Sequence, residues 1–198
     1  MKHNYFKHIL LCFCFLAGLN AFAYDAEIDG IYYNLSEGEA TVTYRDNNFN
    51  SYSGSVVIPP SINHGGETYP VTSIGLHAFF ECSDLTSITI PNSVGYIGTA
   101  AFMFCSSLAS VTIPESVTSI EMQAFFGTAW YNAQPDGILY LDDWLIGYKG
   151  NKPTGNVTIN NGTRGIATHA FYVCEGLTSV TIPNSVTIIC SQAFSRCI

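Results

Sequence analysis

The stretch Ser73-Ile-Gly-Leu-His-Ala-Phe-Phe-Glu-Cys-Ser-Asp-Leu-Thr-Ser-Ile-Thr-Ile-Pro-Asn-Ser-Val-Gly95 is the unit from which most of this chain is built. The pattern returns 23 residues later, over Tyr96–Thr118. Its Ala-Phe pair begins at positions 78, 101, 124, 170 and 193, in steps of 23, 23, 46 and 23 residues. A fixed period in this range, with apolar residues in fixed slots, is typical of a solenoid. The sequence therefore predicts a repeat solenoid whose short strands form a parallel sheet.

The first 23 residues have the pattern of a secretory signal peptide. A basic start is followed by the apolar run Ile9–Leu19 and the small-residue site Ala21-Phe-Ala23. This arrangement is typical of a cleaved signal, and the run is shorter than the roughly 20 residues that a membrane span needs. A lipoprotein needs a cysteine where Leu19 stands. We therefore predict a secreted or cell-surface protein that starts at Tyr24, carries no lipid anchor and has no transmembrane segment after cleavage.

The chain that remains is acidic. Without Lys2 and Lys7, five Lys and Arg side chains stand against 15 Asp and Glu side chains. Phosphate binding needs clustered cations, so this balance argues against nucleic acid or an anionic membrane as a partner. The same excess charge also keeps a secreted protein soluble, and that interpretation is sufficient by itself.

The N-terminal part differs from the repeats. Residues 24–52 contain two β-rich runs joined at Ser36-Glu-Gly38, which predicts a β-hairpin. The open end of a solenoid exposes core and strand edge, so we expect this N-terminal β-hairpin cap to cover it. The repeat domain is then predicted to span residues 53–198.

The repeat period breaks once and then stops. Around residues 132–154, two β-rich runs flank Asp142-Asp143, which predicts an inserted β-hairpin; a degenerate extra repeat is the alternative. The last repeat is incomplete, because the chain stops at Ile198 before the next strand. A truncated fragment of a longer array would account for this, and the bare edge favours edge-to-edge self-association at the C-terminal end.

Five cysteines follow the signal, and four of them occupy one repeat slot. Buried thiols pack as small apolar side chains, which explains a repeated slot without any disulfide. Neighbouring turns would also bring equivalent Cα atoms within about 5 Å, a distance that a disulfide spans. The sequence is therefore compatible with two arrangements: disulfides Cys82–Cys105 and Cys174–Cys197, or a column of free thiols. The fifth cysteine, Cys190, lies outside this slot.

The unit Ile-Gly-x-x-Ala-Phe-x-x-Cys-x-x-Leu-x-Ser-Val-Thr-Ile-Pro-x-Ser-Val resembles the BspA-type leucine-rich repeat, also known from treponemal surface proteins. The resemblance covers about residues 53–198, and residues 24–52 look like the leader of such proteins in host-associated anaerobic bacteria. It implies a non-enzymatic secreted or surface protein, and some members are adhesins that bind extracellular-matrix proteins or other cells. The chain departs from the pattern at Glu121, Ala167 and Cys190, which replace glycine, and at Thr128, which replaces the cysteine.

The polar face of the strands is the predicted concave surface and the candidate ligand-binding face. Ser87 and Thr89 alternate with buried-type residues such as Ile88, so one side of the strand is polar. Such a face could hold an extended protein segment or a glycan, or it could simply keep the sheet soluble, because it lacks the Trp, Tyr and Arg typical of binding hot spots. The candidate residues are Ser87, Thr89, Asn92, Ser110, Thr112, Glu115, Asn156, Thr158, Ser179, Thr181 and Asn184. An exposed Trp144 at the tip of the second hairpin is a further candidate contact.

The sequence predicts no enzyme, no metal and no cofactor. It has no HExxH, no GxSxG and no glycine-rich phosphate loop. His77 and His169 occupy the same repeat slot about 20 Å apart, too far to share a metal. Two hypotheses follow. The chain is a surface-displayed scaffold that binds proteins or glycans, or it is a structural spacer or fragment with no ligand site of its own.

Overall fold

The computed structural model describes residues 24–197, so the predicted signal peptide lies outside the described residues. Within this range the chain consists of short strands with one short helix, and no helix there is long and apolar enough to cross a membrane. The elements in chain order are β1 (Ala26–Ile28), β2 (Ile31–Ser36), β3 (Glu39–Thr43), β4 (Gly54–Val57), β5 (Ser61–His64), β6 (Glu67–Ile74), β7 (Leu85–Thr89), β8 (Tyr96–Ile97), β9 (Ser119–Ile120), α2 (Ala129–Ala133), β10 (Gly137–Leu141), β11 (Trp144–Lys149), β12 (Gly155–Thr158), β13 (Gly165–Ile166), β14 (Leu177–Thr181) and β15 (Ile188–Ile189).

Phenylalanine rings of successive turns stack to form the centre of the core. Phe79, Phe102 and Phe125 are at most 1% exposed, and their neighbouring ring centroids lie 5.0 and 5.4 Å apart. Phe171 and Phe194 stack in the same way at 5.2 Å. Each slot of the 23-residue unit lies over its equivalent in the next turn, so the period produces an apolar column. The predicted repeat solenoid is confirmed.

Every described turn contains a left-handed residue just before the alanine of the Ala-Phe pair. These residues are His77, Ala100, Gln123, His169 and Gln192, with φ between 52° and 59°. None of them is glycine, although glycine adopts this conformation at the lowest cost. The backbone ladder between turns stabilises the bend: the Phe79 N–H, for example, donates to the Ala101 carbonyl at 2.8 Å.

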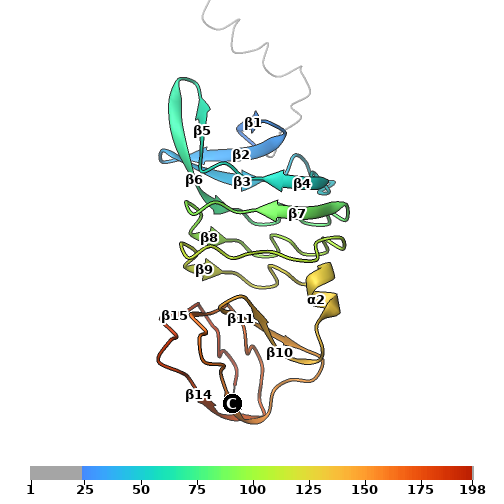
Figure 1. Cartoon of the computed structure of the whole chain (residues 1–198), viewed down its shortest axis with the longest axis vertical. Helices are drawn as coiled ribbons and strands as arrows, with labels where there is room; N and C mark the ends of the chain where they lie inside the picture. The colour runs from blue at the N-terminus through green and yellow to red at the C-terminus, as the bar shows by residue number, and fades with distance from the viewer. Residues whose placement is uncertain (1–23, 198) are drawn as a thin grey trace, which may run out of the picture.

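The first half of the chain forms a seven-stranded sheet and a separate two-stranded sheet (Figure 1). Hairpin β2–β3 starts the larger sheet, in which β3 pairs in parallel with β6, followed by β8 and β9. Strand β5 pairs with β6 as a hairpin that turns at Gly65 and Gly66. Strands β4 and β7 pair in parallel, with Ser55 opposite Ser87. Successive turns are therefore stacked in parallel, as their sequence predicts.

The second hairpin, β10–β11, starts another sheet and does not extend the first. Strand β11 pairs in parallel with β13, and the sheet order is β10-β11-β13-β15. The register repeats that of the first half: the aligned residues Tyr33, Val42 and Ile74 correspond to Tyr140, Leu145 and Ile166. Strands β12 and β14 pair as β4 and β7 do, including a register shift after the leading glycine. The hairpin expected as an insertion thus opens a second run of turns.

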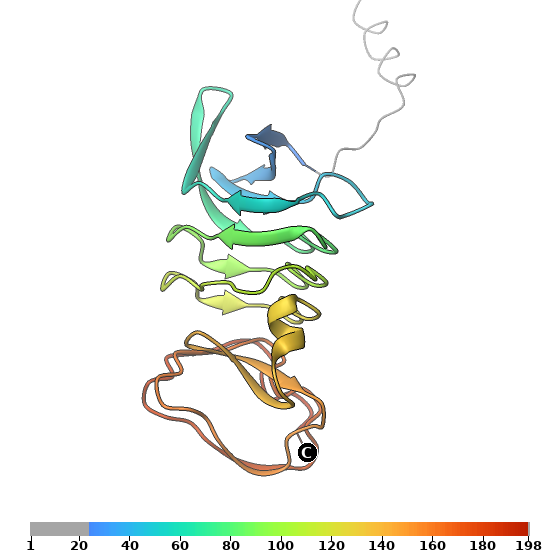
Figure 2. The same cartoon turned by 45° about the vertical axis from the view of Figure 1, so that its right-hand side comes forward.

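The two runs of turns point in different directions. In both views the turns of the first half are seen edge-on, whereas those of the second half are seen open (Figures 1 and 2). Residues 108–112, expected to continue the strand side after β7, pair with no strand of the described chain. Helix α2 lies beside this edge, and its Trp130 N–H donates to the Leu108 carbonyl at 3.0 Å. Thr128 caps the helix by accepting from the Tyr131 N–H at 3.0 Å, which gives the residue that replaces the cysteine a structural role.

The acidic turn of the second hairpin joins the two halves. The Asp142 carboxylate accepts a hydrogen bond from the Ile113 N–H at 2.7 Å, at the edge of the first half. Arg164 pairs with Asp143 at 2.6 Å and donates to the Val117 carbonyl at 2.7 Å. These side chains satisfy backbone groups where one run of turns ends and the next begins.

Candidate functional site

The candidate residues on the strand side all lie at the surface. We call this set the Ser/Thr face: Ser87, Thr89, Asn92, Ser110, Thr112, Glu115, Asn156, Thr158, Ser179, Thr181 and Asn184, every one of them exposed. Hydrogen bonds between turns order parts of it. The Ser87 hydroxyl donates to the Ser55 hydroxyl at 2.8 Å, and the Ser179 hydroxyl donates to the Asn156 side-chain oxygen at 2.8 Å. The face offers hydroxyl and amide groups, with one carboxylate.

The Ser/Thr face is divided and does not form one column. Its first part lies on or just after β7 and on residues 110–115, which belong to no strand of the described chain, and its second part lies on or just after β12 and β14, in a different sheet. The division follows from the second hairpin, which starts a new sheet between them. A ligand that follows the strand side therefore meets two short polar surfaces.

Trp144 is fully buried, so the expectation of an exposed contact at the hairpin tip is wrong. Its side chain is 0% exposed and faces Gly165, where an added Cβ would lie 2.6 Å from the indole ring. The Arg164 guanidinium carbon lies 5.4 Å from the ring centroid. The position is buried because β11 lies inside a sheet, between β10 and β13.

The cysteines of the repeat slot are free thiols in the structure. The Cys105 thiol donates to the Phe79 carbonyl and the Cys197 thiol to the Phe171 carbonyl, each at 2.9 Å. Burial raises the pKa of Cys82 and Cys105, which keeps both in the thiol form. The slot therefore joins neighbouring turns by hydrogen bonds and apolar packing.

A row of aromatic side chains runs along the turns on the outside of the first half. This aromatic row consists of Tyr44, Phe49, Phe80, Phe104, Phe126 and Tyr131, with successive centroids 4.9–6.0 Å apart. Phe104 and Phe126 are 40% and 37% exposed. Exposed aromatic side chains that lie in contact are the kind of surface that contributes most to binding.

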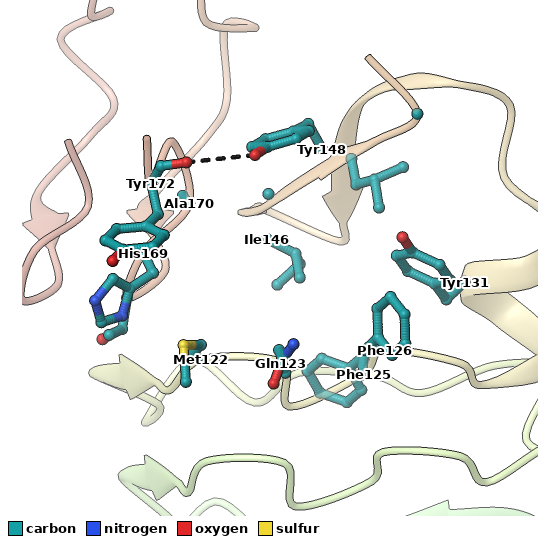
Figure 3. Close-up of a pocket in the computed structure, with 14 residues that line it drawn as sticks. Met122, Gln123, Phe125, Phe126, Tyr131, Ile146, Tyr148, His169, Ala170 and Tyr172 are labelled. Atoms are coloured by element: carbon teal, nitrogen blue, oxygen red, sulfur yellow. Dashed lines mark hydrogen bonds between the residues drawn. The ribbon is translucent and has the colours of Figure 1, made fainter. Parts of the chain in front are cut away.

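The aromatic row ends at a pocket of about 340 Å³ between the two halves, the junction pocket (Figure 3). Met122 and Phe126 come from the last turn of the first half, Tyr131 comes from α2, and Tyr148 comes from β11. The opposite wall consists of His169 and Tyr172, whose rings lie 4.9 Å apart. The Tyr148 hydroxyl donates to the Tyr172 carbonyl at 3.3 Å, which connects two of these walls.

Two polar atoms of residues that line the junction pocket have no hydrogen-bond partner. They are the Thr168 hydroxyl and the His169 Nδ1 atom. Thr168 is 6% exposed, and its backbone N–H donates to the Ile120 carbonyl at 2.9 Å across the junction. Both atoms are covered by the protein, so a ligand in the pocket does not reach them in this conformation.

Metal-binding clusters are not present in the part of the chain that the structure describes: no group of three or more His, Cys, Asp or Glu side chains converges there. His77 contacts the rings of Phe49 and Phe80 at 5.4 and 4.9 Å. Both histidines of the repeated slot thus take part in aromatic contacts.

Sequence reasoning missed the junction pocket and the aromatic row. A signal existed: Phe80, Phe126 and Tyr172 each follow directly after an Ala-Phe pair, in a slot that points out of the core. What the sequence does not contain is the meeting of two runs of turns, which brings Tyr148 and Tyr172 opposite Phe126.

Comparisons with known proteins agree with the architecture. The family described as "BspA type Leucine rich repeat region" matches in six copies, with the match placed at residues 147–198. A leucine-rich repeat protein from Bacteroides ovatus is 31% identical, with a TM-score of 0.53 over 88% of this chain and 45% of its own. No curated protein matches.

Two further solved structures are similar. A leucine-rich cell surface protein from Faecalibacterium prausnitzii is 28% identical, with a TM-score of 0.44, over 85% of this chain and 45% of its own. The leucine-rich repeat protein from T. pallidum is 24% identical, with a TM-score of 0.49, over 87% of this chain and 67% of its own. The chain therefore spans less than half the length of the Bacteroides and Faecalibacterium proteins.

Proposed function

Because this chain belongs to the BspA-type leucine-rich repeat family, we propose that it is a secreted or cell-surface scaffold that binds proteins in an adhesin-like role, without chemistry of its own. The binding surface in this proposal is the Ser/Thr face. Its partners would be extracellular-matrix proteins or proteins on the surface of other cells. The pattern of residues 1–23 supports export.

The observation that carries the proposal is the exposure of all eleven members of the Ser/Thr face on stacked parallel turns. Hydrogen bonds already hold Ser87 and Ser179 to the neighbouring turn. Groups that are ordered before binding lose less entropy when a partner arrives. Exposed hydroxyl and amide groups on two short surfaces suit the backbone and polar side chains of an extended protein segment.

The test is capture of fibronectin, laminin and collagen by immobilised residues 24–198. The face variant carries Thr89→Ala, Thr112→Ala and Thr181→Ala. A matched control carries Thr68→Ala, Thr118→Ala and Thr187→Ala, three exposed threonines outside the face. Loss of three hydrogen bonds of about 1 kcal/mol each lowers affinity by at least tenfold.

We expect the face variant to lose capture and the control to retain it. Equal capture by both variants would overturn the role of the Ser/Thr face. No capture of any matrix protein would instead favour the alternative function, a spacer within a longer repeat protein.

A further inference from the structure

The junction pocket exists because the second hairpin starts a new sheet. In an unbroken solenoid, the next turn would cover the last turn of the first half, including Met122 and Phe126. Here Ile146 and Tyr148 of β11 lie across a gap from them, and the gap remains as a cavity of about 340 Å³ (Figure 3). That volume lies at the lower end of the range for small-ligand sites.

The residues that line the junction pocket are mostly aromatic and apolar, and none of them carries a carboxylate, ammonium or guanidinium group. The nearest cations lie over two of the rings: Lys149 Nζ is 5.5 Å from the Tyr131 centroid and the Arg196 guanidinium carbon is 5.6 Å from that of Tyr172. Burial raises the pKa of Tyr131 and of Tyr148, so both stay neutral phenols at physiological pH. Gln123 adds an amide at the rim. These walls suit an uncharged ligand with both apolar and hydrogen-bonding surfaces.

We infer that the junction pocket binds one or two pyranose rings of a neutral oligosaccharide. The C–H faces of a pyranose ring are apolar and electropositive, so they stack on the negative faces of rings such as Phe126 and Tyr131. Sugar hydroxyls both donate and accept, so they suit the Gln123 amide and the Tyr131 hydroxyl, which line the pocket (Figure 3).

An apolar peptide side chain would fit the pocket less well. It would fill the aromatic part but displace water from the Gln123 amide and the Tyr131 hydroxyl without replacing its hydrogen bonds. The next ring of the aromatic row, Phe104, meets Phe126 edge-on at 5.8 Å and so does not extend the stacking surface of the pocket. This sugar site goes beyond the protein-binding role proposed for the Ser/Thr face.

The experiment measures binding of maltotetraose, cellotetraose, mannotetraose and chitotetraose to residues 24–198 by saturation-transfer NMR and calorimetry. Phe126→Ala removes an exposed stacking ring from the pocket and should weaken binding about fivefold. Phe104→Ala is the matched control: it is equally exposed and belongs to the same row, but it does not line the pocket. We expect its affinity to be unchanged.

Tyr131→Phe separates a sugar from an apolar ligand. It keeps the ring and removes the hydroxyl, so tetrasaccharide binding should fall about fivefold while the melting temperature is retained. Tryptophan amide serves as the apolar probe. The proposal is overturned if no tetrasaccharide binds, if Phe126→Ala and Tyr131→Phe both bind as the parent does, or if tryptophan amide alone binds and Tyr131→Phe strengthens it.

The Ser/Thr face variant provides the distinction between the two proposals. Its substitutions lie outside the junction pocket, so it should retain tetrasaccharide binding while losing matrix proteins. Phe126→Ala should show the opposite pattern. Each proposal can therefore fail alone.

Discussion

The hairpins β2–β3 and β10–β11 start their sheets in the same register, but only the second has another run of turns packed against it. In the first hairpin the two-residue turn is Glu37-Gly38; in the second it is Asp142-Asp143, and both carboxylates accept hydrogen bonds at the junction. At the next position along β11, Trp144 stands where β3 has Thr41. The difference shows what a new sheet needs when it starts in the middle of a chain. Its first hairpin must carry side chains that bond to the backbone groups at the end of the preceding run of turns.

A tyrosine in each hairpin shows the same difference on a smaller scale. The Tyr140 hydroxyl accepts from the Asn160 N–H at 3.2 Å, whereas the equivalent Tyr33 hydroxyl is buried without a partner. Pro59 stands at the position of Asn160 when Gly54 is aligned with Gly155, and proline has no N–H to donate. The residue at this position, Asn160 or Pro59, therefore decides whether the tyrosine hydroxyl has a hydrogen-bond donor and can stabilise its half of the chain.

The largest effect should come from Trp144→Ala. Removal of this fully buried indole should lower the free energy of unfolding by about 3–5 kcal/mol, because a large cavity forms beside Gly165. Thr41→Ala at the equivalent position of the first hairpin should cost less than about 1 kcal/mol. Urea denaturation measures both, and similar values for the two would contradict the comparison.

Arg164→Ala should come next. The guanidinium, with a side-chain exposure of 20%, joins Asp143 to the Val117 carbonyl, and its loss should cost about 1.5–3 kcal/mol. Unfolding should then separate into two transitions, because the halves lose a shared contact. The exposed pair Arg45–Asp46 provides the control: Arg45→Ala should cost about 1 kcal/mol or less and leave a single transition. A single transition in Arg164→Ala would show that the halves are held together by other contacts.

The tyrosine pair should respond to the same chemical change with opposite signs. Tyr140→Phe leaves the Asn160 N–H without its acceptor and should cost about 1 kcal/mol. Tyr33→Phe removes a buried hydroxyl that has no partner and should be neutral or stabilising. Melting curves of the two variants test this, and a larger loss in Tyr33→Phe would indicate a partner for that hydroxyl.

The smallest expected effect is a dependence of stability on alkaline pH. Burial raises the pKa of Tyr33 to about 12 from its ordinary value of 10.0. The folded state then holds this proton more tightly than the unfolded chain, so its contribution is complete below pH 10 and falls as pH rises toward 12. The loss should be about 0.4 kcal/mol at pH 10. Tyr33→Phe should remove this part of the pH dependence, and identical pH profiles would contradict the assignment.

The solenoid could be predicted because its information is local: the Ala-Phe pair and the preceding isoleucine recur at fixed steps, and stacking follows. The start of the second sheet at β10–β11 could be predicted only in part. The match between Asp29–Tyr33 and Asp136–Tyr140 is visible in the sequence, but the fit of Trp144 over Gly165 depends on residues 21 positions apart that meet only after folding.

The candidate site was less accessible to sequence reasoning than the fold. The exposure of Ser87 and Thr89 follows from alternation along a strand, and the structure places both at the surface. The junction pocket depends on the divergence of two winding axes, which no local pattern records. The left-handed residues, such as Ala100, were also hidden, because glycine is the usual signal for that conformation.

A hairpin at the head of each half also bears on the order of folding. A two-residue turn brings two strands together at a low entropic cost of loop closure, and such hairpins form within microseconds. Each run of turns thus has a nucleus built from neighbours in sequence, onto which later turns can add one at a time. During synthesis from the N-terminal end, the first run can be complete before β10 emerges, and the second does not compete with it for the same strand partners.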